Sequence, residues 1–255
     1  MSSTTLGVSF VLVLLAAVAA AAPRKTLPSY VKTCSSSDPK LNECALKHGR
    51  EIIPRIMKGD PSIRLPVLEP MILDKAEIRT AGGANGGGLH LTCYKCNVHG
   101  LSKAKLNDIK IDLKKKHLDL KVFLPSLSVT GKYDVNGRLL LFPVYGKGQA
   151  NLTLNDLDVT AGLDWKLVKR KGGEFAHVAS EQVDFTTSKF SLSLTGLFNG
   201  DKALNDNMNA ILNESWREVL NDLKPSISDT VGQIIRFTLN NIFDVIPYDQ
   251  FFPDK

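Results

Sequence analysis

Two kinds of hydrophobic periodicity divide this chain, and they constrain its fold more than any other feature. From about Met71 to Leu197, apolar residues alternate with polar ones, which is the period of a half-buried β-strand. From Leu204 onward, apolar residues instead recur at intervals of three and four, which is the period of an amphipathic helix. The sequence therefore predicts an α+β fold in which long antiparallel strands are followed by a long C-terminal helix.

The strand region contains its own turn and bulge signals. Asn136-Gly137 lies between two apolar runs, and this dipeptide predicts a two-residue hairpin. The alternation changes phase at Asn155-Asp156, which predicts a β-bulge, and residues 171–173 predict the next turn. Because long bulged strands bend, we expect a curved sheet that wraps around the C-terminal helix.

The helical region continues to Phe243 with one interruption. Pro225 predicts a break or kink, after which Ser226 is a candidate cap for the second half. The same spacing places Asn209 and Asn213 on the polar face, opposite the apolar stripe. A shorter helix is predicted near the N-terminus, beginning after Asp38-Pro39 and shortened or kinked by Pro54.

The first 22 residues predict a secretory signal peptide. An unbroken run of small and apolar residues extends from Gly7 to Ala22 and ends in alanines just before Pro23. The alternative is an uncleaved membrane anchor, but the run is shorter than the ~20 apolar residues that a spanning helix needs. We therefore expect a secreted, extracellular protein with one domain over residues 23–255 and no transmembrane segment in the mature chain.

Secretion places the cysteines in an oxidising compartment. Cys34 and Cys44 are ten residues apart and are the favoured disulfide pair, which would tie the N-terminus to the first helix, although four cysteines allow three connectivities. Two tripeptides that begin at Asn151 and Asn213 are candidate glycosylation sites, and both are compatible with secretion.

The other two cysteines, Cys93 and Cys96, lie between His90 and His99 and suggest a zinc site at first sight. The flanking residues alternate, however, so we expect a strand, on which His90 and Cys96 face one side and Cys93 and His99 the other. Regular strand geometry also puts Cys93 and Cys96 about 10 Å apart, beyond the Cα separation of a disulfide. The sequence thus predicts unpaired or loosely paired thiols and no metal site.

Charge and motif content argue against several classes of function. The net charge is +6, from 32 basic and 26 acidic residues, and the only dense basic run is residues 114–116, which does not indicate nucleic-acid binding. The chain lacks the nucleophile elbow, the zinc-protease helix motif and the phosphate-binding loop. We therefore expect no enzyme activity and no cofactor.

Several segments, taken in order along the chain, resemble the insect Takeout and juvenile-hormone-binding-protein family. They cover essentially the whole mature chain. The segments are residues 34–44, 59–70, 98–102, 197–209, 223–225 and 242–252, together with Trp216. Cys93 and Cys96 depart from the family's pattern.

This resemblance implies a TULIP-like fold, in which a curved antiparallel sheet wraps around a long C-terminal helix and encloses an apolar tunnel. Members of the family are secreted carriers of juvenile hormone, terpenoids or fatty-acid-like molecules, and are linked to circadian output, feeding and chemosensation. The resemblance also supports the disulfide between Cys34 and Cys44. It implies a small lipophilic ligand as partner, and we expect a monomer.

Aromatic residues on the expected inner face are candidates for lining such a tunnel, although plain core packing is the favoured interpretation of each. They are Phe142, Tyr145, Phe185, Phe190, Trp216 and Phe243. The alternative function is that of a secreted protein with a solid core, which binds lipid surfaces or microbial lipids without a small-molecule cavity.

Overall fold

Antiparallel strands make up the largest part of the structure, a computed structural model that describes residues 25–80 and 88–254. The strands are β1 (Met71–Arg79), β2 (His90–His99), β3 (Lys105–Asp112), β4 (His117–Leu139), β5 (Phe142–Arg170), β6 (Gly173–Thr186) and β7 (Lys189–Leu194). The helices are α1 (Leu41–Ile56), α2 (Lys202–Glu214) and α3 (Trp216–Phe243). The predicted signal peptide, residues 1–22, lies outside the described residues and stays a prediction.

The pair formed by β4 and β5 is the axis of the sheet. These strands have 23 and 29 residues and are paired from Leu139↔Phe142 to His117↔Asp164. A typical strand has about 5–6 residues, so the right-handed twist accumulates here over several ordinary strand lengths. The sheet therefore curls, as the sequence predicted.

An irregularity halfway along this pair divides the sheet into two parts. Asp156 adopts a left-handed φ of 46°, and neither Asp156 nor Pro125 is paired in the register of β4 with β5. On one side of this point β3 and β6 flank the central pair, and on the other side β2 and β7 do. The irregularity predicted at Asn155-Asp156 is confirmed, and it lies where β5 exchanges one neighbouring strand for another.

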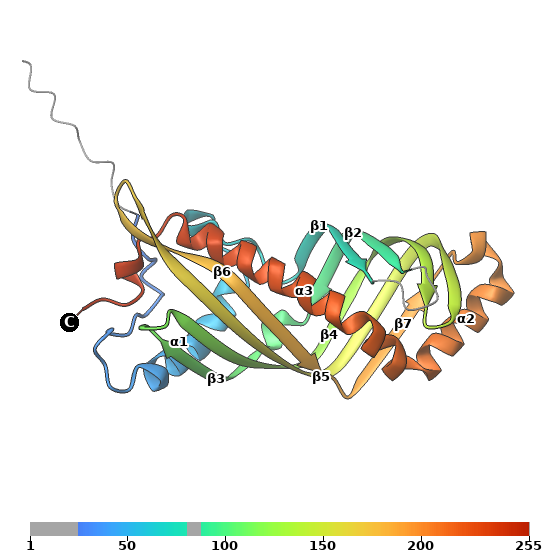
Figure 1. The fold of residues 1–255 in the computed structure, drawn as a ribbon, viewed down its shortest axis with the longest axis horizontal. Helices are drawn as coiled ribbons and strands as arrows, with labels where there is room; N and C mark the ends of the chain where they lie inside the picture. The colour runs from blue at the N-terminus through green and yellow to red at the C-terminus, as the bar shows by residue number, and fades with distance from the viewer. Residues whose placement is uncertain (1–24, 81–87, 255) are drawn as a thin grey trace, which may run out of the picture.

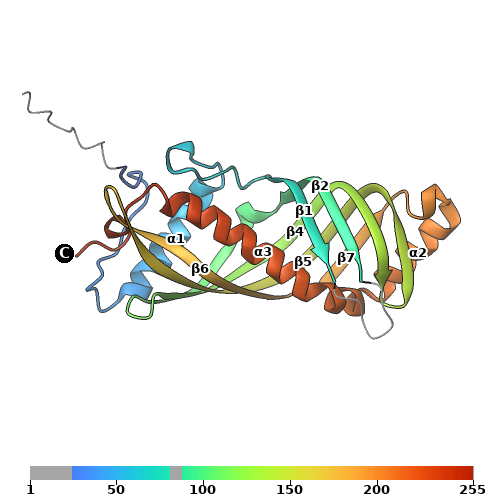
Figure 2. The same ribbon diagram turned by 45° about the horizontal axis from the view of Figure 1, so that its top comes forward.

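The three helices are distributed along an elongated molecule (Figures 1 and 2). α1 and α2 lie near opposite ends, and α3 runs obliquely between β6 and β1, contacting both strands (Figure 1). β1 and β6 are the two ends of the strand order β1-β2-β4-β5-β6, from which β3 and β7 branch, so α3 bridges the two ends of the curled sheet. The predicted α+β arrangement of a curved sheet around a C-terminal helix is confirmed.

Asparagines spaced four apart on α2 cover the open edge next to β7. Their Oδ1 atoms accept hydrogen bonds from backbone N–H groups over 2.8–3.0 Å. The pairs are Asn205 with Leu197, Asn209 with Leu194 and Asn213 with Leu192. The amide nitrogens of Asn209 and Asn213 donate back to the carbonyl oxygens of the same partners. A side-chain amide offers the donor and acceptor of a peptide group, so α2 takes the place of a neighbouring strand.

This ladder corrects the prediction that Asn209 and Asn213 lie on a solvent-facing side. Both side chains are partly buried between α2 and the sheet. The nitrogen that a glycan would occupy on Asn213 donates to the carbonyl oxygens of Leu192 and Asn209. Asn151, in contrast, is exposed on β5, and its glycosylation stays a prediction.

The hairpin predicted at Asn136-Gly137 is wrong. Both residues lie inside β4, and the chain turns instead at Leu140 and Leu141, where Leu140 has a φ of 56°. Gly137 has a φ of 138°, and a Cβ atom added there would lie 2.2 Å from the carbonyl oxygen of Gly88. The glycine is therefore needed for a close approach of two backbones and not for a turn.

The break predicted at Pro225 is also misplaced. The helical region divides at Ser215, where φ is −94° and ψ is 32°, and α3 continues through Pro225. Pro225 and Asn221 are both exposed, so the carbonyl that loses its intrahelical donor faces solvent. Ser226 does not cap a helix, because its hydroxyl donates to the carbonyl oxygen of Arg79 on β1.

Cys93 and Cys96 form a disulfide, contrary to the sequence prediction. Their Cα atoms are 6.0 Å apart, within the usual range for a disulfide, because the strand is not regular between them. The register of β2 with β4 shifts between Tyr94 and Asn97, and Lys95 has a φ of 49°. This bulge shortens the segment and turns both cysteines to one face of the sheet. The second disulfide, between Cys34 and Cys44, agrees with the prediction.

All four cysteines are therefore expected to be oxidised in the native protein. Alkylation with iodoacetamide under denaturing, non-reducing conditions should add no mass, and alkylation after reduction should add four groups. Intact-mass spectrometry measures both. Two groups added without reduction would support the original prediction of free thiols at Cys93 and Cys96.

The packed core lies toward the α2 end, around Leu197, Leu212, Trp216, Val219 and Leu223, and is called here the α2-end cluster. Trp216 is 7% exposed in it. Trp216→Ala is therefore expected to lower the free energy of unfolding by ~3–5 kcal/mol. Leu204, half exposed on α2, supplies the control, and Leu204→Ala should cost under ~1 kcal/mol.

Urea unfolding followed by circular dichroism measures both variants without depending on tryptophan fluorescence. Equal losses for Trp216→Ala and Leu204→Ala would contradict the placement of Trp216 in a packed core.

Candidate functional site

The face of α3 that meets β6 is polar and close-packed. Lys224 pairs with Asp184 over 2.7 Å, and the side chain of Asn240 accepts a hydrogen bond from the N–H of Val178 over 2.8 Å. Between these points the helix backbone approaches the strand at Gly232, where an added Cβ would lie 2.9 Å from Cγ of Glu181. Glycine at this position lets the helix lie directly against β6.

The face of α3 that meets β1 is joined by two hydroxyl groups. Ser226 Oγ donates to the carbonyl oxygen of Arg79 over 2.7 Å, and Thr230 Oγ1 lies 3.2 Å from the carbonyl oxygen of Glu77. Ser226 and Thr230 are four residues apart and so project from the same side of the helix. These bonds use backbone acceptors that β1 would otherwise present to water as an edge strand.

The inner face of α3 passes between two packed regions. Its first half belongs to the α2-end cluster. Its last residues pack against a second cluster built on Ile63, Leu65 and Ile246, called here the α1-end cluster. Val231 and Ile235 lie between them, belong to neither cluster, and retain partial solvent accessibility. Within the described residues, the inner face of α3 is therefore packed at its two ends and partly accessible between them.

Strand residues on the inner face of this part of the sheet differ in burial: Leu163 and Ala161 of β5 are buried, whereas their partners on β4 are not. On β4, Leu118 and Leu120 continue the inner-face alternation of Val122 and Leu124 but are only half-buried. The residues between them, such as Asp119, are exposed on the outer face. We call the region around Leu118, Leu120, Val231 and Ile235 the middle interior. Its surface is apolar and accessible, which suits an apolar guest.

A cleft of about 650 Å³ opens between β1 and α3. At one end it is lined by apolar side chains, among them Met71, Leu73 and Ile234. At the other end lies Glu77, whose pKa is lowered to about 2 by hydrogen bonds from Lys75 and Arg79. The cleft therefore has an apolar end and a charged end.

A second cleft, of about 470 Å³, lies between β6 and α3 and is polar. Its lining includes Glu181, Asp184, Lys224 and Ser228. The Glu181 side chain is 9% exposed and forms an ion pair with Arg236 over 3.2 Å, although its Oε2 atom accepts no hydrogen bond within the described residues. This cleft thus follows the polar seam that holds α3 against β6.

The aromatic residues predicted to line a tunnel fall into three groups. Phe185, Phe190 and Trp216 are buried in the α2-end cluster. Phe243 is partly buried and packs edge-to-face on Phe251 near the C-terminus. Phe142 and Tyr145 follow the β4–β5 turn and are exposed. The structure thus does not bring the six together, and ligand contact by any of them stays a prediction.

The sequence did contain a signal for the middle interior, because its aliphatic residues continue the helical and strand periodicities. Val231 and Ile235 belong to the helical pattern, and Leu118 and Leu120 to the strand pattern. Periodicity identifies the inner face but carries no information on how tightly that face is packed, so sequence reasoning selected the larger aromatic residues instead.

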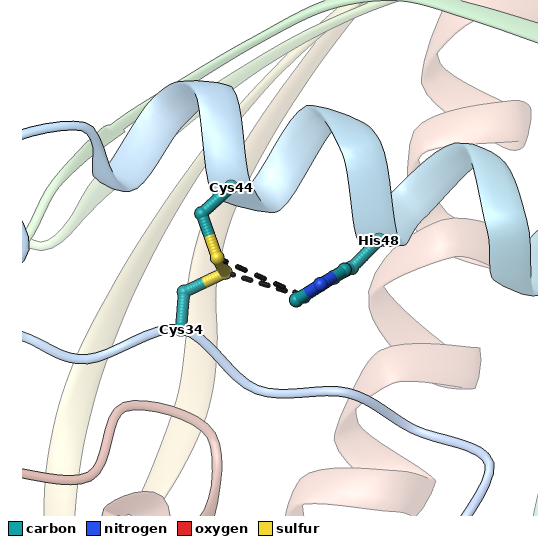
Figure 3. A group of neighbouring side chains, drawn as sticks. All are labelled: Cys34, Cys44 and His48. Atoms are coloured by element: carbon teal, nitrogen blue, oxygen red, sulfur yellow. Dashed lines mark hydrogen bonds between the residues drawn. A yellow bond between two sulfur atoms is a disulfide. The ribbon is translucent and has the colours of Figure 1, made fainter.

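Cys34, Cys44 and His48 lie together at the start of α1 (Figure 3). His48 Nδ1 is 3.6 Å from the sulfur of Cys34 and 3.7 Å from that of Cys44. Three such groups within reach of one another are a candidate metal site by distance. Metal binding requires thiolates, however, and both sulfurs are committed to the disulfide. The group therefore anchors the N-terminal segment to α1.

A hydrogen-bonded chain of polar side chains lies on the outside of the sheet. His117 Nδ1 is 2.7 Å from Asp164 Oδ1, His117 Nε2 is 3.1 Å from Asp119 Oδ1, and Ser180 Oγ donates to Asp164 Oδ2 over 2.7 Å. In a hydrolase triad the imidazole must accept the hydroxyl proton directly. Here both the hydroxyl and the imidazole bind the carboxylate, so the order differs from that of a nucleophile–base–acid triad.

The two carboxylates raise the pKa of His117, Asp164 through the larger contribution and Asp119 through the smaller. A raised pKa means that the folded state binds the proton more tightly than the unfolded state. The resulting stabilisation is complete below the ordinary histidine pKa of 6.5 and is lost as the pH rises through the raised value.

Asp164→Asn is therefore expected to lower the His117 pKa, as measured by NMR titration of the imidazole. The stability advantage of the wild type over this variant should shrink as the pH rises through the raised pKa of His117. Asp158→Asn, which removes another exposed carboxylate of β5, should leave the His117 titration unchanged. A His117 pKa that is the same in wild type and Asp164→Asn would contradict the assignment.

Within the described residues, no helix has the length and apolar character needed to cross a membrane.

The profile of the family described as "Haemolymph juvenile hormone binding protein (JHBP)" matches residues 11–253. The chain is 28% identical over 234 residues to "Circadian clock-controlled protein daywake" of Drosophila melanogaster, covering 88% of each chain. It is 19% identical over 227 residues to "Putative beta-carotene-binding protein" of Schistocerca gregaria, covering 88% of this chain and 89% of that one.

The fold is shared with a solved structure. The crystal structure of Epiphyas postvittana Takeout 1 matches with a TM-score of 0.72 and 25% sequence identity, covering 88% of this chain and all of that one. The curved sheet, the long C-terminal helix and the match over residues 11–253 agree. The chain therefore belongs to the haemolymph juvenile hormone binding protein (JHBP) family, as a Takeout-like member.

Proposed function

We propose that this protein is a secreted carrier that holds a small lipophilic ligand in the middle interior. Juvenile hormone, another terpenoid or a fatty-acid-like molecule would suit this region. The observation that carries the proposal is the partial accessibility of inward-facing aliphatic residues such as Leu120 and Val231, between two clusters that are packed. A residue on the inner face of a sheet or helix is ordinarily buried by its neighbours, and here a guest would complete the burial.

The energy available from such burial is sufficient for useful affinity. A ligand of about 15 carbons gains roughly 0.8 kcal/mol for each buried methylene, or ~12 kcal/mol in total. Association and ordering cost ~4 kcal/mol or more, which leaves up to ~8 kcal/mol. This corresponds to a dissociation constant near ~1 µM without any charged anchor.

The names of the relatives support the same chemical class. The family is described by juvenile hormone binding, and the Schistocerca gregaria relative is named for β-carotene. Both molecules are apolar isoprenoids. The oxidised cysteines and the predicted signal peptide support an extracellular site of action. We infer that the chain is a carrier and not an enzyme.

Native mass spectrometry of protein secreted from insect cells, followed by solvent extraction, tests the proposal. A co-purified lipid that extraction removes, or tight binding of the fluorescent fatty acid cis-parinaric acid by the extracted protein, is the expected result. Saturating ligand should stabilise the fold by about 2.7 kcal/mol at 100 times its dissociation constant. A protein that binds vesicles but neither co-purifies with nor binds a lipid would favour the alternative of a solid, surface-binding domain.

The variant Val231→Asp tests whether the ligand binds in the middle interior. An ionised carboxylate is costly to bury against an apolar guest, so this variant should lose at least about tenfold in affinity for cis-parinaric acid. Val231→Thr keeps the shape and should show a smaller loss, which separates binding from folding defects. Leu204→Asp introduces the same charge on the exposed side of α2 and is expected to bind like the wild type. Unchanged affinity in Val231→Asp would place the ligand elsewhere.

A further inference from the structure

We propose that the ligand enters and leaves the middle interior sideways, through a slit between β1 and α3. The slit is defined by Met71, Ile72 and Leu73 of β1 and by Ile234, Phe237 and Thr238 of α3, which line the cleft described above. This inference rests on the proposed carrier function and adds the route by which the ligand passes.

The first argument is that the hydrogen bonds joining β1 to α3 are confined to one end. Within the described residues they are made by Ser226 to Arg79 and by Thr230 to Glu77, both in the second half of β1. At the first half of β1, the opposing helix residues are Ile234, Phe237 and Thr238. The cleft between them is the place where strand and helix are not joined by such bonds.

The second argument is the exposure of large apolar side chains on both rims. Phe237 is 68% exposed on α3, and Ile72 is 60% exposed on β1. Val67, which also lines the cleft, is 52% exposed. Scattered exposed apolar residues are common, but here three of them surround one opening, which is the pattern of a binding surface. An apolar molecule that leaves water meets these side chains first.

The inner wall of the slit continues this apolar surface toward the middle interior. Met71 and Leu73 pair with Val98 and Cys96 of β2, both of which are buried, so the two β1 side chains lie on the inner face of the sheet. Ile234 is partly buried beside Val231 and Ile235 on α3. The apolar lining therefore runs from the exposed rim to the proposed binding region.

The opposite seam of α3 is a poor alternative route. Along β6 the helix is held by Lys224 with Asp184, by Arg236 with Glu181 and by Asn240 with the backbone of Val178. Passage there requires these ion pairs and hydrogen bonds to break, and it brings an apolar molecule against charged groups. The structure thus assigns the two seams different roles, with β6 as the fixed side and β1 as the opening side.

A route differs from a binding site in its kinetic signature. An obstacle on the route raises the barrier for entry and exit equally and leaves the bound and free states unchanged. The association and dissociation rate constants must then fall by the same factor, and the dissociation constant stays the same. A change in the binding site itself alters their ratio.

Phe237→Cys, labelled with a bulky maleimide, places such an obstacle on the rim. All four native cysteines are in disulfides, so the introduced thiol is the one that reacts. Leu141→Cys, labelled in the same way, is the matched control, because Leu141 is 75% exposed at the distant β4–β5 turn. Stopped-flow fluorescence of cis-parinaric acid gives both rate constants.

The labelled Phe237→Cys protein is expected to show at least about a tenfold fall in both rate constants with an unchanged dissociation constant, while the control matches the wild type. A double variant, Ser226→Ala with Thr230→Val, removes the two hydroxyl contacts and should raise both rate constants. Thermal unfolding of each variant shows that it remains folded.

The outcomes separate the two proposals. If the wild type binds the probe and the rates are insensitive to the rim label and to the double variant, the side entrance is wrong and the carrier function stands. If the rim label changes the dissociation constant in proportion to one rate constant, Phe237 belongs to the binding site and the route is overturned. If the wild type binds no lipid at all, both proposals fail.

Discussion

The backbone groups of the strand edges are the constraint on which this structure depends. The sheet curls without closing, so β1, β3, β6 and β7 are each paired on one side only. An unpaired edge is both an energetic cost and a template for aggregation. Each of these strands is met by polar side chains of a helix: α1 on β3, α2 on β7, and α3 on both β1 and β6. The helices thus act as partial substitutes for missing strands.

This arrangement bears on why part of the inner face of α3 remains partly accessible. A helix that covers a sheet usually stays in place because its apolar face interlocks with the sheet. α3 does so over its first half and again at its last residues, but between these regions it is held at the rims by Thr230, Arg236 and Asn240. Because these contacts position the helix from its sides, its inner face does not have to be filled by the protein. The polar contacts at the sides of α3 and the apolar residues on its inner face therefore belong to the same arrangement.

The sequence predicted the parts of the fold that follow from periodicity and missed those that follow from tertiary contact. The long strands, the C-terminal helix and the irregularity at Asp156 were all readable from the spacing of apolar residues. The asparagines of α2 were assigned to solvent because polarity alone does not distinguish a hydrated amide from one that binds a strand edge. Their spacing of four residues was the available signal, but it indicates pairing with a strand edge only when the neighbouring sheet is known.

The other misses have the same origin. Gly137 looked like a turn residue, but its conformation serves the approach of Gly88, which lies almost fifty positions earlier in the chain. The regular-strand argument against a disulfide between Cys93 and Cys96 failed because one left-handed residue, Lys95, changed the geometry. Three of the six aromatic residues predicted to contact a ligand, Phe185, Phe190 and Trp216, lie in the packed α2-end cluster, which the period of the sequence alone does not reveal.

The close approach at Gly232 has a consequence for how a chain of this kind can diversify. The side chain of Glu181 leaves no room there for a Cβ atom on the helix, so this contact limits which residue the helix can carry where it lies against β6. A residue larger than glycine would require the Glu181 side chain or the helix to shift, because an added Cβ would lie 2.9 Å from Cγ of Glu181. The separation of α3 from β6 can therefore change through a single substitution, while all other residues along this seam keep their identity.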